Sequence, residues 1–228
     1  MYPKPSCILL LGDQASLVDA AEAYAHRLFD VRCAPRAVRS QKSLDSSVAQ
    51  AIQDEPVDFI LSFLSPVIVP QSVLSAAKIA ALNFHPAPPR WPGVGSASFA
   101  LYEGDKEFGV TAHLMSAKVD SGPILRTISF PILQEDDCEL LWSRALHHTL
   151  TLFYDVAFDL AMKGNVIPSG EKWERPAITR KQFEQWMVIP PGTAVEEIRR
   201  KVRALRHPRF PGPFMEVAGV RFAALAAA

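Results

Sequence analysis

Short apolar runs alternate with amphipathic stretches along the first third of the chain, and this pattern limits the folds that the chain can adopt. Cys7–Leu11 contains no polar residue and is bounded by Pro5 and Gly12. A strand that is apolar on both faces is typical of a sheet that helices cover on both sides. Further strands are predicted at Phe29–Cys33, Asp58–Phe63 and Ile79–Phe84, and helices at Gln14–Arg27, Leu44–Gln53 and Val73–Ala77. Because strand and helix alternate, we expect an α/β fold with a mostly parallel sheet.

The same alternation continues beyond residue 84. Two strand-like runs, Phe108–Met115 and Gly122–Ile132, precede a long helical pattern at Asp136–Lys163. Gly164 ends this helix, since glycine is common just after a helix C-terminus. These elements complete a Rossmann-like unit with helices on both faces of the sheet, which we place at residues 1–165.

The remaining residues, 166–228, are rich in proline, arginine and aromatic side chains. A basic amphipathic helix is predicted at Thr193–Leu205, and an Ala-Gly turn between two β-prone runs predicts a hairpin at Phe214–Phe222. A segment this short rarely builds its own core. We therefore expect a C-terminal extension of helix and hairpin that packs on the main unit.

Charge and cysteine content narrow the functional classes. Lys and Arg number 24, as do Asp and Glu, so the chain lacks the overall positive field of a general nucleic-acid binder, and we expect no DNA partner. Cys7, Cys33 and Cys138 are odd in number and far apart, which indicates buried thiols in a reducing compartment rather than disulfides or a metal site. The apolar run near the N-terminus is too short for a signal peptide or a membrane span. We therefore expect a cytoplasmic protein.

A polar pair stands where the strand at Ile79–Phe84 meets a proline-rich loop. Asn83 and His85 are two residues apart, so in an extended chain their side chains point to the same side. The loop His85–Gly95 has four prolines and two glycines, which predicts a rigid connection at the carboxyl end of the sheet. Ligands of open α/β sheets bind at that end. By themselves, however, an Asn and a His at a strand end are more often turn formers or satisfied structural groups.

Asp120 lies farther along, in the connection between the two strand-like runs that follow the loop. It precedes Ser121 and Gly122. An Asp in such a sequence is usually a turn residue. Spacing alone therefore assigns it no function.

Four motifs in order resemble a known family. Asn83, His85 and Pro86 form Asn-x-His-Pro, and the Pro/Gly loop follows; Gly109–His113 then reads GVTAH, and Val119–Gly122 reads VDSG. This series is similar to that of the formyltransferases that use N10-formyltetrahydrofolate as the formyl donor. The resemblance makes residues 1–165 the formyltransferase catalytic domain.

The resemblance also implies roles for three residues. Asn83 would donate hydrogen bonds to the formyl oxygen as negative charge grows on it. His85 would assist at that oxygen or act as an acid and base. Asp120 would orient His85 and help to remove the proton of the attacking amine. The catalytic residues that we predict are therefore Asn83, His85 and Asp120.

The binding residues follow from the same resemblance. The donor's pterin would contact mainly backbone groups before the Asn-x-His motif and before the catalytic Asp. The predicted donor-binding residues are Pro66, Val67, Ile68, Val69, Ser116, Ala117, Lys118 and Val119. Pro66 has no backbone N–H, so the contact pattern departs from that of the family, and Pro66–Pro70 has the alternative interpretation of an apolar core turn.

The acceptor is inferred from the sequence around the loop and in the tail. This chain most resembles the sugar N-formyltransferases, including those that act on GDP-perosamine for O-antigen synthesis. The resemblance is in the segment NFHPAPP…PGVG and in the arginine-rich tail. A nucleotide-linked amino sugar needs cations for its pyrophosphate and a ring for its base. The predicted substrate-binding residues are Phe84, Pro86, Arg90, Trp91 and Gly93. Trp91 has the alternative of a loop anchor.

Other acceptors and classes stay open. The acceptor could be another small amine, such as an amino acid or hydroxyornithine, or methionyl-tRNA, and a relative that only binds or hydrolyses the folate is a third class. His113 is expected to make a structural hydrogen bond rather than to act in catalysis. We expect no metal site and, from the apolar tail, a homodimer.

Overall fold

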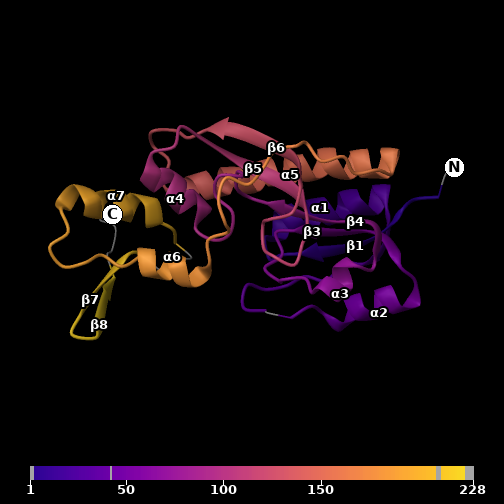
Figure 1. The fold of residues 1–228 in the computed structure, drawn as a ribbon, viewed down its shortest axis with the longest axis horizontal. Coiled ribbons are helices and arrows are strands. Elements are labelled where there is room, and N and C mark those ends of the chain that lie inside the picture. Colours follow the sequence, from indigo (N-terminus) through magenta and orange to yellow (C-terminus); the bar gives the residue numbers. More distant parts are fainter. Residues whose placement is uncertain (1–2, 42, 209–211, 224–228) are drawn as a thin grey trace.

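A computed structural model describes residues 3–41, 43–208 and 212–223, and its centre is a six-stranded sheet (Figure 1). The strands, in chain order, are β1 (Ser6–Leu11), β2 (Asp30–Cys33), β3 (Val57–Phe63), β4 (Ala77–His85), β5 (Glu107–Leu114) and β6 (Ile124–Pro131). Their spatial order is β2-β1-β3-β4-β5-β6. The first four are parallel, β5 is antiparallel to β4, and β6 is antiparallel to β5. The predicted α/β fold with a mostly parallel sheet is confirmed.

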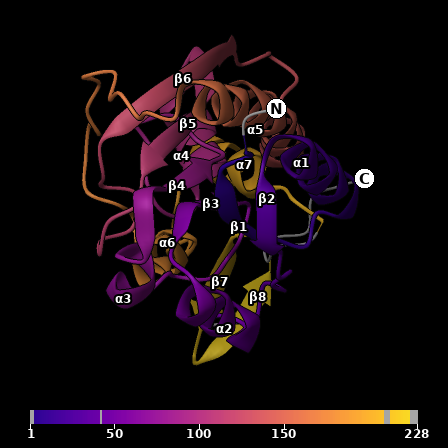
Figure 2. The same cartoon turned by 90° about the vertical axis from the view of Figure 1, so that its right-hand side faces the viewer.

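Side-chain alternation along the strands explains why helices cover both faces. In β1, Leu9 belongs to the apolar cluster on one face and Ile8 to the cluster on the other, and both are fully buried. The helices α1 (Ala15–Leu28) and α5 (Cys138–Lys163) cover the first face, while α2 (Ser46–Asp54) and α3 (Gln71–Leu74) cover the second (Figure 2). A strand buried on both faces has to be apolar throughout, as Cys7–Leu11 is.

The short helix α3 differs from the prediction at Val73–Ala77. It begins after Pro70 and ends at Leu74, and Ala77 already pairs with Val57 as the first residue of β4. Pairing with a neighbouring strand outweighs the weak helical preference of four residues, because one turn of helix is barely stable alone.

The helix α4 (Ser96–Glu103) was not predicted, since its sequence lacks an amphipathic stripe. Gly95 and Gly104 flank it in left-handed conformations that favour glycine. Most of its small and apolar residues are buried, on more than one side of the helix. A helix enclosed on several sides has no polar face to reveal its period.

Helix α5 is the longest element and joins two parts of the molecule. The side chain of Asp137 accepts a hydrogen bond from the Leu140 backbone at its start, and Gly164 in the left-handed region ends it, as predicted. Near the start, Cys138 lies 3.4 Å from the hydroxyl of Ser98 in α4. Farther along, Tyr154 packs against Tyr24 of α1.

The C-terminal region contains α6 (Arg180–Trp186), α7 (Val195–Leu205) and a hairpin of β7 (Phe214–Val217) and β8 (Val220–Ala223). These elements gather beside α4 at one end of the molecule (Figure 1). Tyr102 of α4 donates a hydrogen bond to Glu197, and Arg200 donates to the Tyr102 carbonyl at 2.7 Å. The predicted helix and hairpin are confirmed. Helix α6, with a capping box at Thr179 and Gln182, was not predicted.

The three cysteines differ in burial. Cys7 and Cys138 are buried, Cys33 is half-buried, and none of the three forms a disulfide. Burial raises the pKa of the Cys138 thiol to about 11, so it is uncharged. Among the described residues, no helix is long and apolar enough to cross a membrane.

Candidate active site

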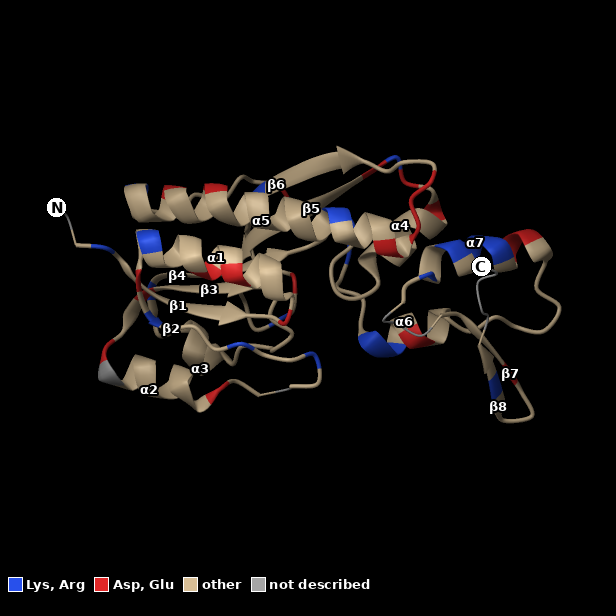
Figure 3. Ribbon diagram, turned by 180° about the vertical axis from the view of Figure 1, so that it is seen from behind, with Lys and Arg blue, Asp and Glu red and all other residues tan. Residues whose placement is uncertain are grey.

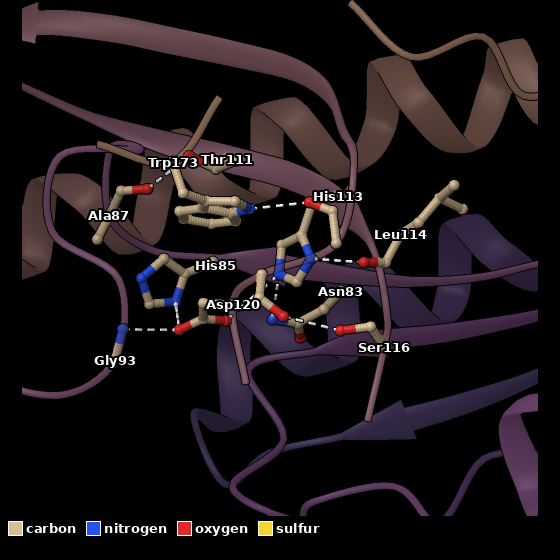
Figure 4. Close-up of polar contacts among 12 residues, drawn as sticks. Asn83, His85, Ala87, Gly93, Thr111, His113, Leu114, Ser116, Asp120 and Trp173 are labelled. Atoms are coloured by element: carbon tan, nitrogen blue, oxygen red, sulfur yellow. Dashed lines mark hydrogen bonds and ion pairs between the residues drawn. The ribbon is translucent and has the colours of Figure 1, made fainter. Parts of the chain in front are cut away.

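The carboxyl end of β4 presents the predicted polar pair to one side of the sheet. Asn83 is half-buried and His85 is buried, and both side chains point toward the loop between β5 and β6 (Figure 4). Phe84, between them, points to the opposite face, where its ring packs against Phe63 and Phe153. The prediction that Phe84 contacts substrate is therefore wrong: alternation along the strand places its ring in the core.

Asp120 closes the site from the β5–β6 loop. Its φ of 42° lies in the left-handed region, an unusual conformation for a non-glycine residue. The buried carboxylate accepts a hydrogen bond from the Gly93 amide at 2.8 Å through Oδ2. Its two oxygens each lie 3.3 Å from an imidazole, Oδ2 from Nδ1 of His85 and Oδ1 from Nε2 of His113. The structure thus brings Asn83, His85 and Asp120 together, as the motifs implied.

The electrostatics of this cluster favour an anion beside a neutral ring. Burial alone would raise the pKa of Asp120, but the charge of His85 and the hydrogen bond from His113 outweigh it and hold the pKa at about 2. Burial lowers the pKa of His85, although the charge of Asp120 opposes this effect. Near neutral pH, Asp120 is ionised and His85 is uncharged.

The contacts of His85 suit a ring that gains a proton. Besides Asp120, the ring faces the Trp91 carbonyl, which lies 3.3 Å from Nε2. A neutral imidazole has one N–H and can donate to only one of these two acceptors, whereas a protonated ring donates to both. These two acceptors favour the protonated ring and partly offset the burial that lowers the pKa of His85.

His113 orients Asn83, in agreement with the structural hydrogen bond that the sequence suggested. Its Nδ1 lies 2.8 Å from the Leu114 carbonyl, which requires a hydrogen on Nδ1. When the ring is neutral, Nε2 accepts from the side-chain nitrogen of Asn83 over 3.2 Å. When the ring is protonated, Nε2 donates instead to Oδ1 of Asp120 at 3.3 Å, and together with the charge of His85 this contact lowers the pKa of that carboxyl. The second hydrogen of that nitrogen remains for another acceptor.

Trp173 is a member of the site that the sequence did not reveal. It lies in the connection between α5 and α6, and its ring meets the imidazole of His113 edge to face at 5.0 Å and that of His85 at 6.0 Å (Figure 4). Its Nε1 donates to the Gly122 carbonyl at 2.8 Å. No sequence motif marks a residue whose partners lie so far away along the chain.

Gly93 shows why the loop after β4 needs glycine. Its φ of 86° is left-handed, and a Cβ there would lie 2.2 Å from the carbonyl oxygen of Ile178. Its amide is the donor to Asp120, so the left-handed backbone of Gly93 helps to hold that carboxylate in place. The loop is held from outside by Glu174 and Ile178, whose amides donate to the carbonyls of Pro89 and Pro92.

Trp91 is buried, which removes its predicted role as a platform for a nucleotide base. Only 1% of the residue is exposed. One face stacks on Phe99, Arg175 lies 3.9 Å from the ring centroid, and Nε1 donates to Asp105 at 2.7 Å. The ring anchors the loop, which was the alternative interpretation. Arg90 forms an ion pair with the same carboxylate, since its Nε lies 3.3 Å from Oδ2 of Asp105.

Two cavities meet at this cluster. The first, of about 190 Å³, reaches Asn83, His113 and Asp120. Its walls include every residue of the predicted donor site: Pro66, Val67, Ile68, Val69, Ser116, Ala117, Lys118 and Val119. Two of the wall residues, Ser65 and Pro66, also line the second cavity, so the two are adjacent.

The second cavity is larger, about 540 Å³, and has walls from many parts of the chain. His85, Pro86 and Gly93 reach it from β4 and the following loop. Its walls also include charged and aromatic side chains from other parts of the chain: Asp13, Arg39, Trp142, Arg180, Phe183 and Glu184. Helix α6 therefore forms part of a cavity that opens onto the cluster.

Comparison with known proteins identifies the family. A family model described as formyl transferase matches residues 4–156, more than half of the chain, and the chain belongs to this family. A methionyl-tRNA formyltransferase from Ehrlichia canis is 29% identical over 187 residues, which are 81% of this chain and 58% of that protein. The chain spans little more than half the length of the curated relatives that it matches.

Solved structures share the fold. A sugar N-formyltransferase from a Shewanella species superimposes with a TM-score of 0.78 at 18% identity, over 98% of each chain. HypX from Aquifex aeolicus, solved with tetrahydrofolic acid, superimposes with a TM-score of 0.67 at 18% identity, over 96% of this chain and 37% of that one. At these identities the likeness concerns the fold.

Proposed function

We propose that this chain transfers a formyl group from N10-formyltetrahydrofolate to the amino group of a nucleotide-linked amino sugar, such as GDP-perosamine. The strongest support is that two cavities meet at one pair of residues. Asp120 lines the first cavity, His85 lines the second, and their side chains are 3.3 Å apart. A group transfer between two bound molecules needs one on each side of the reacting groups.

The first cavity has the chemistry of a folate site. Two loops, 65–69 and 115–120, form most of its walls, and they are the segments at which the family resemblance puts the pterin. The HypX structure with tetrahydrofolic acid has the same fold, which supports this assignment. When bound, N10-formyltetrahydrofolate would supply an activated formyl group.

The residues of the cluster then have distinct tasks. Asn83, held by His113, directs its remaining amide hydrogen at an oxygen that gains negative charge. His85, uncharged near neutral pH, accepts the proton that the attacking amine must lose. Asp120 holds the imidazole and stabilises its charged form.

The identity of the acceptor rests on weaker support than the transfer itself. The Shewanella sugar N-formyltransferase matches over nearly all of both chains, which favours an amino sugar. The curated relatives named as methionyl-tRNA formyltransferases make methionyl-tRNA the second candidate. The equal numbers of acidic and basic residues favour the smaller acceptor, because RNA binding depends on a positive surface.

A direct assay tests both parts. The chain is incubated with N10-formyltetrahydrofolate and, separately, with GDP- and dTDP-linked 4-amino sugars, methionyl-tRNA or free amino acids. We expect an N-formylated amino sugar by mass spectrometry. Formylation of methionyl-tRNA or an amino acid alone would refute the sugar, and formate release without any acceptor would indicate hydrolysis.

We also propose that the enzyme acts in the cytoplasm as a homodimer. The apolar side chains exposed on the hairpin, such as Val220 and Phe222, support association. A monomer mass by light scattering would contradict the dimer.

A further inference from the structure

Two arginines from distant parts of the chain face the second cavity. Arg39 lies in the loop after β2, and Arg180 is the first residue of α6. Both line the cavity together with His85. In Figure 3 a blue segment near the tip of the loop after β2 lies toward the blue first turn of α6. The catalytic cluster and this pair of guanidinium groups therefore share one space.

The two positive charges influence each other. Partial burial and the charge of Arg180 lower the pKa of Arg39, while the charge of Asp13 opposes this change. Like charges that line one cavity destabilise each other, and an anion bound between them would remove that cost. Guanidinium groups bind phosphate oxygens through paired hydrogen bonds, so phosphate is the anion that suits them.

We propose that Arg39 and Arg180 bind the phosphates of the acceptor, so that the second cavity selects an amine linked to a nucleoside diphosphate. This inference rests on the proposed formyl transfer, because it assigns a chemical class to the acceptor of that reaction. It also replaces Arg90 and Trp91, neither of which lines the second cavity, as the source of phosphate recognition.

The rest of the cavity agrees with this class of ligand. Its volume of about 540 Å³ lies in the range of roughly 300–1,000 Å³ that small-molecule sites have. Trp142 offers a half-buried ring to a base. The Phe183 ring, which also packs against Phe99 and Trp186, borders the same cavity. Asp13 and Glu184 add two carboxylates, which disfavour a long polyanion such as RNA but tolerate a compact diphosphate that also carries an amine.

Binding of nucleoside diphosphates to the whole chain tests the proposal. GDP and dTDP are titrated calorimetrically into the wild type, R39Q, R180Q and the control R199Q, whose arginine is exposed on α7 and lines neither cavity. We expect each of R39Q and R180Q to weaken binding at least tenfold and R199Q to change it less than twofold. R180K, which keeps the charge, is expected to bind better than R180Q.

Several outcomes would overturn the proposal. They are no binding of either diphosphate by the wild type, equal affinities in all variants, or equal binding of guanosine and GDP. Tighter binding of an RNA ending in CCA, lost in the same variants, would assign the arginines to RNA instead. Thermal melting of each variant shows that it is folded.

Tetrahydrofolate titrated into the same proteins separates this inference from the proposed function. We expect the folate affinity to be unchanged in R39Q and R180Q, since neither arginine lines the first cavity. If the wild type binds diphosphates through both arginines but binds no folate, the phosphate site stands and the formyl transfer is wrong. If it binds folate and formylates only amines without phosphate, the formyl transfer stands and the phosphate site is wrong.

Discussion

The two cavities that meet at Asp120 and His85 are built in different ways. The first draws most of its walls from loops 65–69 and 115–120, which belong to the part of the chain that the family match covers. The second adds α6 and residues after α7, which lie beyond that match. A reaction needs one fixed geometry for its chemistry, whereas the choice of acceptor can vary with the later segments. The first cavity therefore lies in the part of the chain that the family shares, and the second includes the later segments that we propose select the acceptor.

The two cavities also differ in the charged side chains on their walls. In the first cavity, Lys118 and Asp120 are the charged side chains on the described wall. The second cavity has Asp13, Arg39, Arg180 and Glu184 on its walls. The first cavity therefore has fewer charged side chains on its wall, and the charges of the second suit it to a charged ligand.

The largest effect is expected where the two cavities join. Asp120→Ala removes the anion that holds His85 and should lower turnover about 10³-fold. Turnover is measured with both donor and acceptor at saturating concentrations. The loss should be the same for every acceptor, because the residue serves the transfer rather than the selection. Near-wild-type turnover in a folded variant would remove Asp120 from the mechanism.

Asn83→Ala should have the next largest effect, a loss of about 10² to 10³ in kcat. The side chain offers its hydrogen to charge that grows during the reaction, so the KM of either substrate should change little. Steady-state kinetics with each substrate varied in turn measure this. A rise in donor KM with unchanged kcat would make Asn83 a binding residue of the first cavity only.

Acid should weaken the fold through the same cluster. The pKa of Asp120 is lowered from 3.8 to about 2, so its contribution to the free energy of unfolding is present above pH 4 and is lost as the pH falls toward 2. That loss is roughly 2 kcal/mol. Urea unfolding of wild type and Asp120→Asn at several pH values measures it. If both lose stability in parallel over this range, the carboxylate has no such role.

Trp173 links the region after α5 to the imidazoles of His85 and His113. Trp173→Leu keeps apolar volume but loses the ring contacts with His85 and His113 and the hydrogen bond to Gly122. We expect about a tenfold lower kcat and an altered pH profile, because His85 is less firmly held. Trp142→Leu, in the second cavity, is the matched control and should affect acceptor KM instead. An unchanged pH profile in Trp173→Leu would limit the ring to packing.

The smallest effects should distinguish the two cavities directly. Ile68→Ala removes an exposed side chain from the first cavity and should raise donor KM a few-fold. Phe183→Ala should raise acceptor KM by a similar factor and leave donor KM unchanged. Product formation with one substrate saturating and the other varied measures both. Equal changes in both KM values for either variant would mean that the cavities do not act separately.

Much of the fold followed from patterns within single elements. Apolar runs predicted the strands because a strand between two helix layers excludes polar residues. The sequence did not predict helix α4, because its residues are buried on several sides and show no amphipathic stripe. Helix α6 contains no buried residue, so its seven residues show no apolar stripe, and a capping box is their main signal.

The motifs likewise predicted part of the site. Asn83, His85 and Asp120 do lie together, and all eight predicted donor residues line one cavity. Phe84 and Trp91 were assigned to substrate because the Asn-x-His-Pro segment and its loop resemble those of sugar N-formyltransferases, with Trp91 as a ring for the base. Both rings are buried, since neighbours along a strand point to opposite faces and a loop needs an anchor.

By itself the sequence determined the α/β fold, the place of the polar pair at the end of β4, and the family motifs that include Asp120. These features depend on residues that are close together in the chain or that form a recognisable series. Only the tertiary structure decided that Trp173 packs on the imidazoles and that Arg39 and Arg180 face one cavity. Such contacts join residues far apart in sequence, and no local pattern encodes them, because they arise only when the whole chain has packed.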